Sequence, residues 1–283
     1  MRRFFLVMLI VLLCTPAVAE IHLEQPPENW AQDVLRITAI PVGEGDALLL
    51  ECGGERMMVD GGPSARYHQL TGALDARGIT HFKYMLHTHY HDDHINGLYH
   101  LMKNGYTAHE YLHPNSDYYV RKDELERRTV EMAQRKDIAV RRLYDGDTIT
   151  LGGATIRLYR YWDIPNGNGR SMIERVEFGS ASALLCADIT GKTQEYFTAN
   201  LPSDQLKADV IKIPHHGITP VNAEFMDVVD PQFAIVTNHR EDVSQIITQL
   251  DGRGIPARYC ADGAVILETD GSDWYVWQLE EIE

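Results

Sequence analysis

Cysteine is scarce in this chain of 283 residues. Only four are present, Cys14, Cys52, Cys186 and Cys260, and no two have the close C-x-x-C spacing of a zinc knuckle. A small disulfide-stapled scaffold is therefore excluded, and an apolar content of 44% is enough for an ordinary globular core. The three cysteines after Cys14 are an odd number, so at least one thiol is unpaired. We expect them to be buried as small hydrophobic residues.

Basic residues are also in short supply. Lys and Arg total 26 against 41 Asp and Glu, a formal net charge of -15. Such a chain is not expected to coat itself non-specifically onto nucleic acid or an anionic membrane. Residues 121–142 hold eight basic and five acidic side chains, but mixed charges along a helix are typical of a salt-bridged, solvated face. Arg170, Lys212 and Arg240 lie near the motifs below and are candidate phosphate-holding cations.

Long apolar runs are missing except at the amino terminus, where residues 4–13 are all apolar. Arg2 and Arg3 precede this run and Ala17-Val18-Ala19 follows it, a pattern that predicts a signal peptide over residues 1–19. We therefore expect an exported chain, periplasmic or extracellular, with no stable membrane anchor after cleavage. Its net charge becomes -15 - 2 = -17. Lipoprotein processing at Cys14 is a weaker interpretation, because Leu13 stands where a small residue is preferred.

Residues 20–34 are interpreted as an N-terminal lead-in, and residues 35–283 as one αβ domain with two antiparallel-rich sheets and outer helices. The predicted strands cover 35–41, 47–52, 56–60, 83–87, 109–112, two runs within 148–161, 174–178, 183–187, 210–213, 233–237, 257–260 and 265–269. The predicted helices cover 67–77, a helix beginning at residue 95, 120–136, 192–200, 223–229 and 243–250.

Histidine, in contrast, is abundant, with 13 in the chain and six between residues 81 and 100. The centre of this cluster is Thr88-His89-Tyr90-His91-Asp92-Asp93-His94, between a predicted strand and a predicted helix. Imidazole and carboxylate groups are ligands of first-row metals, and this set suits zinc. His89 and His91 face one point while Asp93 and His94 face another, which predicts two ions about 3.5–4 Å apart. The alternative is a solvated histidine-rich loop or an adventitious metal patch.

The histidine motif resembles the metal-binding signature of the metallo-β-lactamase-fold hydrolases, in particular the hydrolase domain of ComEC-type DNA-uptake proteins. The resemblance covers almost the whole mature chain. Its other blocks are IPVGEGDA at 40–47, VDGG at 59–62, LLCADI at 184–189 and DVIKIPHHG at 209–217. The ComEC-type pattern has VGQGDA, IDGG, LLTGDI and DVLKVPHHG in these places. The resemblance implies a single-domain, four-layer αββα sandwich and a metal-dependent hydrolase.

The resemblance also implies a role for particular residues. The metal ligands are His89, His91, Asp93 and His94, with Asp188 as a carboxylate shared by two ions. Asp188 could instead be a helix N-cap. Asp60 is expected just behind the metals, where it orients ligands, or else it is an ordinary turn aspartate. One imidazole of His215-His216 is expected at the site, as a ligand or a proton shuttle, and which of the two points inward stays open.

Two further histidines are less settled as ligands. The fold commonly has a histidine between the first motif and the shared aspartate, and His113 is the best-placed candidate, although it could be a loop residue. The fold also uses a histidine near the last strand–helix junction, where His239 fits. The ComEC-type stretch is longer there than Thr237-Asn238-His239-Arg240, and Ile218 replaces the usual Ser after His-His-Gly.

The implied cofactors are two divalent metal ions, zinc or alternatively manganese. Such a pair makes a metal-bound hydroxide available near neutral pH and stabilises developing negative charge. The candidate catalytic residues are Asp93, His215 and His216, and either histidine could protonate the leaving group. The favoured activity is that of a phosphodiesterase or nuclease on a small-molecule or oligonucleotide phosphoester. The alternatives are hydrolysis of a lactam, lactone or thioester, and a non-catalytic metal-binding module of the cell envelope.

Overall fold

Two mixed β-sheets dominate the computed structural model, which describes residues 19–31, 33–114 and 124–280, with Arg240 by its backbone only. The first sheet has nine strands in the order β1-β16-β15-β2-β3-β4-β5-β6-β7. Their bounds are β1 Ile21–His22, β2 Leu35–Ala39, β3 Leu48–Cys52, β4 Glu55–Val59, β5 His81–Leu86, β6 Thr107–Pro114, β7 Ala139–Leu143, β15 Ala264–Thr269 and β16 Trp274–Leu279.

The second sheet has seven strands in the order β14-β13-β12-β11-β10-β9-β8. Their bounds are β8 Thr148–Leu151, β9 Ala154–Tyr159, β10 Ile173–Phe178, β11 Ala181–Leu185, β12 Val210–Lys212, β13 Phe233–Val236 and β14 Ala257–Tyr259. The helices are α1 Tyr67–Asp75, α2 Asp92–Lys103, α3 Glu124–Arg135, α4 Gly191–Asn200, α5 Ser203–Leu206, α6 Ala223–Val229 and α7 Ser244–Arg253. Short 3-10 turns are η1 Ser64–Arg66, η2 Asn168–Arg170, η3 Pro214–Gly217, η4 Arg240–Asp242 and η5 Cys260–Asp262.

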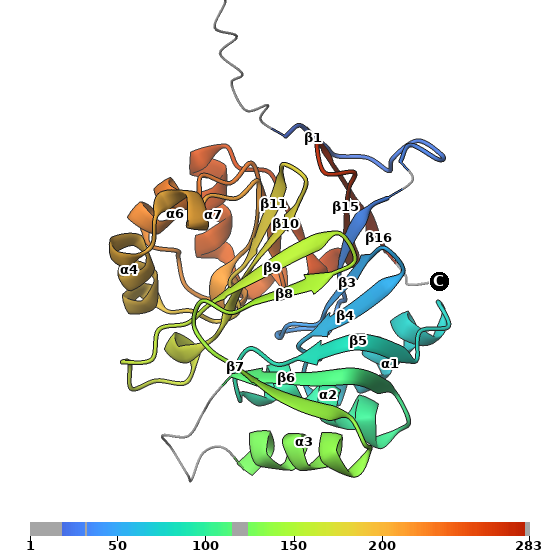
Figure 1. The fold of residues 1–283 in the computed structure, drawn as a ribbon. Helices are drawn as coiled ribbons and strands as arrows, with labels where there is room; N and C mark the ends of the chain where they lie inside the picture. Colours follow the sequence, from blue (N-terminus) through green and yellow to red (C-terminus); the bar gives the residue numbers. More distant parts are fainter. Residues whose placement is uncertain (1–18, 32, 115–123, 281–283) are drawn as a thin grey trace, which may run out of the picture.

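The two sheets pack face to face, with helices on both outer sides, so the predicted four-layer αββα sandwich is confirmed (Figure 1). Alternation along β2 shows how the layers form: Leu35, Ile37 and Ala39 point into the core between the sheets. A second core lies between the first sheet and α1 to α3, and a third between the other sheet and α4, α6 and α7. The three described cysteines are free and buried, as expected.

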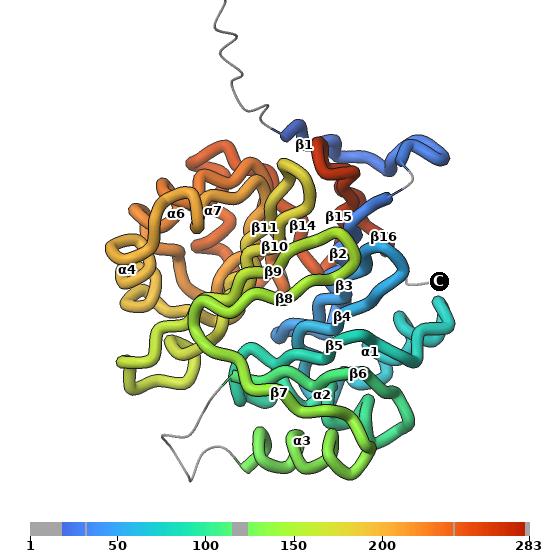
Figure 2. Tube along the Cα trace, in the orientation of Figure 1, coloured from blue at the N-terminus to red at the C-terminus, as the bar shows by residue number. Residues whose placement is uncertain are grey.

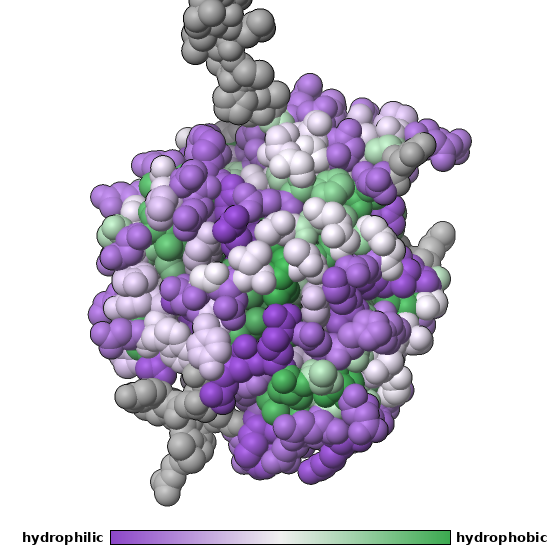
Figure 3. Space-filling model, in the orientation of Figure 1, coloured by the Kyte–Doolittle hydropathy of each residue, from purple (hydrophilic) through white to green (hydrophobic). Residues whose placement is uncertain are grey.

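The N-terminal and C-terminal strands lie side by side, because β1 pairs in parallel with β16 (Figure 2). Glu20 adds to this pairing: its carbonyl accepts from the Trp274 N–H at 2.8 Å. Within the described residues, no helix has the length and apolar character needed to cross a membrane. Figure 3 shows a largely hydrophilic face, on which apolar side chains appear as separate patches.

Most predicted elements are present, with some differences. The sequence patterns missed four elements: the edge strands β1 and β7 of the first sheet, β16 next to β1, and the four-residue helix α5. α2 begins at Asp92 and not at residue 95, so Asp93 and His94 lie in its first turn. The predicted helix over 120–136 corresponds to α3, and its residues 120–123 lie outside the described residues.

The candidate site lies where several strands end. β4 ends before Asp60, β5 before the histidine motif and β11 shortly before Asp188. β12 and β13 end before the 215–216 histidine pair and Thr237. Because parallel strands β11 to β13 end at the same edge of their sheet, these loops meet there.

Candidate metal centre

The first turn of α2 is held against the end of β4 by backbone contacts. The Gly61 N–H donates to the His94 carbonyl at 2.7 Å, and the Gly97 N–H donates to the Gly62 carbonyl at 2.9 Å. The approach is so close that a Cβ on Gly97 would lie 1.8 Å from the Gly61 oxygen. Glycine is therefore required where the two segments cross, and the crossing fixes the direction of the motif histidines.

Asp188 is the centre of the cluster, and its two carboxylate oxygens face different histidines. Oδ1 lies 3.2 Å from His94 Nε2 and 3.1 Å from His216 Nε2. Oδ2 lies 3.8 Å from His89 Nε2 and 3.9 Å from His215 Nε2. Asp188 is only 1% exposed. A buried carboxylate with imidazoles against both oxygens is the arrangement of a ligand shared by two cations.

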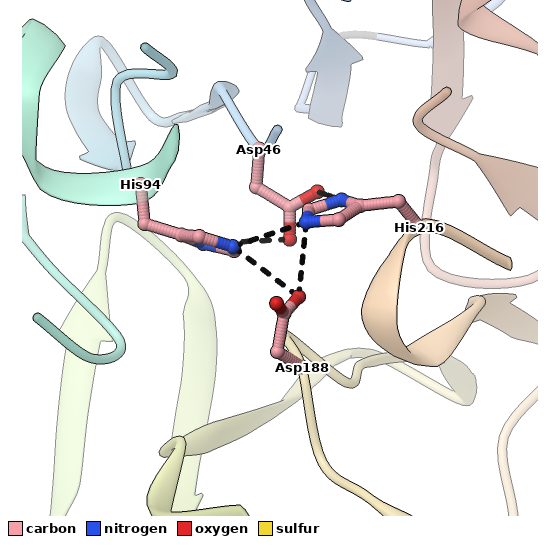
Figure 4. Close-up of side chains that lie close together, drawn as sticks. All are labelled: Asp46, His94, Asp188 and His216. Carbon is pink, nitrogen blue, oxygen red and sulfur yellow. Dashed lines mark hydrogen bonds and ion pairs between the residues drawn. The ribbon is translucent and has the colours of Figure 1, made fainter. Parts of the chain in front are cut away.

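We call the half of the cluster at Oδ1 site 2. It comprises Asp93, His94, His216 and Asp188 (Figure 4 shows the last three with Asp46). The two Nε2 atoms of His94 and His216 are 3.2 Å apart, and Asp93 Oδ2 lies 3.3 Å from that of His216 and 3.9 Å from that of His94. Ligands of a tetrahedral zinc ion, each about 2.0–2.2 Å from the metal, lie roughly 3.3–3.6 Å from one another. The spacing of site 2 is therefore close to that of a zinc site.

Site 1 comprises His89, His91 and the other oxygen of Asp188. One ligand atom from each of the three lies within 4.8 Å of the other two. His89 is 1% exposed, and His91 is partly exposed at the start of α2. Gly167 covers His91, since a Cβ there would lie 2.6 Å from His91 Nε2. The loop between β9 and β10 thus forms a wall of site 1.

The two sites share one supporting carboxylate, Asp60, which is fully buried. Its Oδ2 accepts from His94 Nδ1–H at 2.7 Å and from the Thr88 hydroxyl at 2.7 Å, and its Oδ1 accepts from the Thr88 N–H at 2.8 Å. Because the Thr88 hydroxyl proton is used on Asp60, its oxygen accepts from His89 Nδ1–H at 3.1 Å. Both imidazoles therefore use Nδ1 for this support and turn Nε2 toward the site, the orientation that a metal ligand needs.

The backbone of Asp60 also explains its place in the sequence. Its φ is 56°, in the left-handed region where Asp and Asn are among the few tolerated side chains. Ala187, which precedes Asp188, has φ 42°, and His215 and His216 have φ 49° and 52°. Such non-glycine residues are costly and tend to cluster at functional sites, as they do here.

Sequence reasoning missed Asp46, which holds His216. The Thr237 hydroxyl donates to Asp46 Oδ1 at 2.6 Å, so the Thr237 oxygen accepts from His216 Nδ1–H at 3.1 Å. Asp46 also lies 3.3 Å from His216 Nδ1, on the ring edge opposite Nε2. Its position within the Gly-Glu-Gly-Asp-Ala block was the available signal.

Lys212 forms a buried ion pair with Asp46 and also donates to the Ala187 carbonyl at 3.0 Å. The side chain is 0% exposed. The sequence-based interpretation of Lys212 as a phosphate-holding cation is therefore wrong: its charge compensates a buried carboxylate. Arg170 Nε donates to the Ile164 carbonyl at 2.5 Å, within its own loop. The side chain of Arg240 lies outside the described residues.

The electrostatic field differs between the two sites. Burial alone would lower the pKa of His94, but Asp188 and Asp60 outweigh it and raise that pKa well above its usual range. Burial is likewise outweighed at His216, where Asp188 and Asp46 raise the pKa to about 10. At His89, burial and the neighbouring charge of His94 lower the pKa well below its usual value. Site 2 therefore favours positive charge between its ligands more strongly than site 1.

The residues present fit a pair of divalent ions. His89 Nε2 and Asp188 Oδ1 are buried atoms without a hydrogen-bond partner, a costly state for polar groups that a cation would relieve. Nitrogen and carboxylate donors are also the set that zinc and similar first-row ions accept. The fold and the residue cluster thus fit a dinuclear metal site.

The structure separates the roles of the histidine pair after β12. The left-handed turn points His216 into site 2, where it is 0% exposed. His215 lies farther out, with 27% of its side chain exposed, and its Nε2 is 2.9 Å from Asn168 Nδ2. Asn168 was not anticipated from the sequence, because nothing local marks it.

The structure does not bring His113 into the cluster. His113 Nδ1 lies 3.1 Å from the Pro114 carbonyl and 3.5 Å from Glu126 Oε1, which is 3.4 Å from His87 Nε2. The reason is strand alternation: Leu112 faces the core between the sheets, so His113 points to the opposite face, toward α3. The sequence predicted His113 as a metal ligand. In the structure it is instead part of a contact between β6 and α3.

His239 is also outside the cluster. It is exposed, and its Nε2 would lie 3.4 Å from a Cβ on Gly43, at the margin of the site. β13 ends at Val236, and the residue that reaches the site from its loop is Thr237. Among the described residues, the imidazoles of site 2 are those of His94 and His216, and His239 is not one of the clustered residues.

Comparison with known proteins agrees with this geometry. The family model of the metallo-beta-lactamase superfamily matches residues 40–219, which is more than half of the chain. The chain belongs to this superfamily, whose members are metal-dependent hydrolases. No curated protein matches the sequence.

Two solved structures illustrate the likeness of the fold. The metallo-beta-lactamase fold protein YhfI from Bacillus subtilis is 13% identical, with a TM-score of 0.55 over 83% of this chain and 100% of that chain. CmlA, a diiron beta-hydroxylase from Streptomyces venezuelae, is 16% identical, with a TM-score of 0.50 over 83% of this chain and 53% of CmlA. The chain thus spans about half of CmlA.

Proposed function

We propose that this protein is an exported, ComEC-type phosphodiesterase with two divalent metal ions, zinc or alternatively manganese. The observation that carries the proposal is the position of Asp188, whose two oxygens face different imidazoles. Two-metal sites of this kind are used by phosphatases and nucleases, because both the attacking and the leaving oxygen need stabilisation. All five sequence blocks that resemble the ComEC-type domain meet at this site, which supports the finer family assignment.

Two bound divalent ions would supply an activated water and neutralise the developing negative charge on a phosphoester. The chain's own residues have separate tasks. Asp60 and Thr88 hold His94 and His89, and Asp46 with Thr237 holds His216, so that each Nε2 faces inward. Asp93 closes site 2 on its solvent side, since 24% of its side chain is exposed.

His215 is the proposed proton donor to the leaving group. Unlike the buried His216, it reaches the open side of the cluster, and its Nε2 is 3.9 Å from the Asp188 oxygen of site 1. A positioned histidine near a leaving oxygen accelerates such reactions by about 10²–10⁴-fold. His215→Gln is therefore expected to lower kcat on substrates with a poor leaving group more than on aryl esters, whose leaving group needs no proton.

The substrate is proposed to be a small or locally held phosphoester. Net charge does not favour a broad nucleic-acid surface, and Lys212, a cation buried at the site, is paired with Asp46. Bound metal ions would then supply the attraction for an anionic group. Export is proposed from the signal pattern, and mass spectrometry of the secreted chain should find an amino terminus at Glu20.

The test is a substrate panel on the metal-loaded protein: bis(p-nitrophenyl) phosphate, single-stranded DNA and nitrocefin, with Asp188→Ala as the inactive control. The proposal expects hydrolysis of at least one phosphoester, abolished in the variant. Turnover of nitrocefin alone would indicate a lactam hydrolase. Full metal occupancy without turnover of any of these substrates, or of lactones and thioesters, would indicate a binding module.

A further inference from the structure

The outer face of the nine-stranded sheet contains a cavity on the far side of the sheet from the interior core. α1, α2 and α3 cover the β3–β7 part of this face, whereas β15 and β16 lie beyond them (Figure 1). At the boundary is a cavity of about 380 Å³. This volume is within the range of about 300–1,000 Å³ that is typical of small-molecule sites.

The floor of the cavity is apolar. Side chains of β3, β15, β16 and α1 form it together with Ile40, which follows β2. The apolar lining residues are Ile40, Leu49, Ala73, Ala264, Ile266, Trp277 and Leu279. On β15, Val265 and Leu267 point into the core between the sheets, so Ile266 points out. Ile266 is only 8% exposed.

Two donors in the wall of this cavity lack an acceptor. Thr38 is 8% exposed, and its hydroxyl is a buried atom without a hydrogen-bond partner. Arg36, two residues earlier on the same face of β2, pairs with Glu268 through Nη2 at 3.1 Å, while its buried Nε has no partner. Guanidinium N–H groups only donate, so the partner that Arg36 lacks is an acceptor oxygen.

Two arginines line the cavity, Arg36 and Arg77. Each already has a carboxylate partner, because Arg36 pairs with Glu268 and Arg77 pairs with Glu51. The donors of the lining that remain unpaired are Arg36 Nε and the Thr38 hydroxyl. One anionic group could accept from both of them together.

We propose that this cavity binds an aliphatic carboxylate, with the carboxylate at Arg36 Nε and Thr38 Oγ1 and the chain over Ile266 and Trp277. The cavity is separate from the metal centre, because its walls are outward-facing side chains of the first sheet. The ligand is a free acid of medium chain length, which has one charged end and an apolar body to match the two parts of the cavity.

The test is isothermal titration of the mature protein with decanoate below its micelle concentration. We expect saturable one-to-one binding with a dissociation constant below about 100 µM. Thr38→Val keeps the shape but removes the donor and should weaken binding about tenfold, since a hydrogen bond to a charged group is lost. Thr150→Val, on the exposed face of β8, is the matched control and should bind as the parent protein does. 1-Decanol should bind much more weakly than decanoate.

Two further variants distinguish binding in this cavity from binding at the metal centre or on the protein surface. Ala73→Leu fills the cavity from α1 and should abolish binding, with circular dichroism to show that the fold is kept. Asp188→Ala should leave decanoate binding unchanged, because the metal centre is not involved. Absence of saturable binding to the parent protein, equal affinity for decanol, full affinity in Thr38→Val or loss of binding in Asp188→Ala would each overturn the proposal.

Discussion

Asp60 supports a ligand of each metal site. Asp60→Asn is therefore the most informative substitution among the residues that hold the ligands in place. Asn is tolerated at φ 56°, so the backbone should be kept. The amide retains one acceptor oxygen in place of two, whereas Asp60 accepts from His94 and twice from Thr88. In the variant, His94 loses its direct contact with a carboxylate, which fixes its tautomer. His89 is affected only indirectly, because the Thr88 hydroxyl lies between it and residue 60.

The expected magnitude follows from these contacts. Loss of such a supporting group typically costs about 10–100-fold in metal affinity, which corresponds to about 1.4–2.8 kcal/mol. We expect the larger loss at site 2, where Asp60 touches His94 itself, and a smaller loss at site 1. Zinc titration against a chromogenic chelator resolves the two affinities in the metal-free protein.

The matched control for this experiment is Asp230→Asn. Asp230 is also left-handed, with φ 47°, but lies at the exposed end of α6 and pairs with Lys207. It should leave both affinities unchanged. Unchanged zinc affinities in Asp60→Asn, or an equal loss in both variants, would refute the reasoning that Asp60 acts on the metals through His94 and His89.

Three further outcomes are expected. His216→Ala should remove one equivalent of metal, whereas His239→Ala should retain both equivalents, as measured by elemental analysis. Loss of metal in His239→Ala but not in His216→Ala would show that His239 is the ligand of site 2. Lys212→Met leaves Asp46 buried and uncompensated and should lower the free energy of unfolding by about 3–5 kcal/mol in urea titrations; no loss would contradict the ion-pair role. Since the pKa of His216 is raised to about 10, the metal-free protein should lose stability as pH rises from 6.5 toward 10; a rise in stability over that interval would contradict the sign.

The part of the site that could be predicted from the sequence is the part that is local. His89, His91, Asp93 and His94 lie within one loop and one helical turn, so their spacing alone directs them to neighbouring points. The strands β2, β3 and β4 were also predicted to within two residues at each end, because alternating apolar residues and glycine turns mark them directly. The position of Asp188 after a buried strand was likewise visible.

What failed depends on long-range geometry. Whether His113 faces the core or α3 is decided by the register of β6 in its sheet, and a shift of one residue would reverse it. The inward position of His216 depends on a left-handed backbone at two consecutive histidines, a conformation that is uncommon for residues other than glycine. The pairing of Lys212 with Asp46 spans 166 positions of the chain.

Edge strands escaped prediction for a related reason. β7 carries Arg141 and Arg142 on an exposed edge. Because two consecutive residues are charged, its sequence does not show the alternation of apolar and polar residues that marks a strand. By sequence alone, its five residues look like the continuation of a basic, helical stretch. In the structure α3 ends at Arg135, and its Arg127 and Arg135 pair with Glu131, so this surface is the salt-bridged face that mixed charges indicated.

The central claim is that Asp188 is shared by two metal ions. Anomalous diffraction from crystals of the zinc-loaded protein tests it most directly. The account predicts two peaks about 3.5–4 Å apart, one on each side of the Asp188 carboxylate, with His216 at one of them and neither His113 nor His239 at either. A single peak, or a second ion bound by His113 or His239, would contradict it.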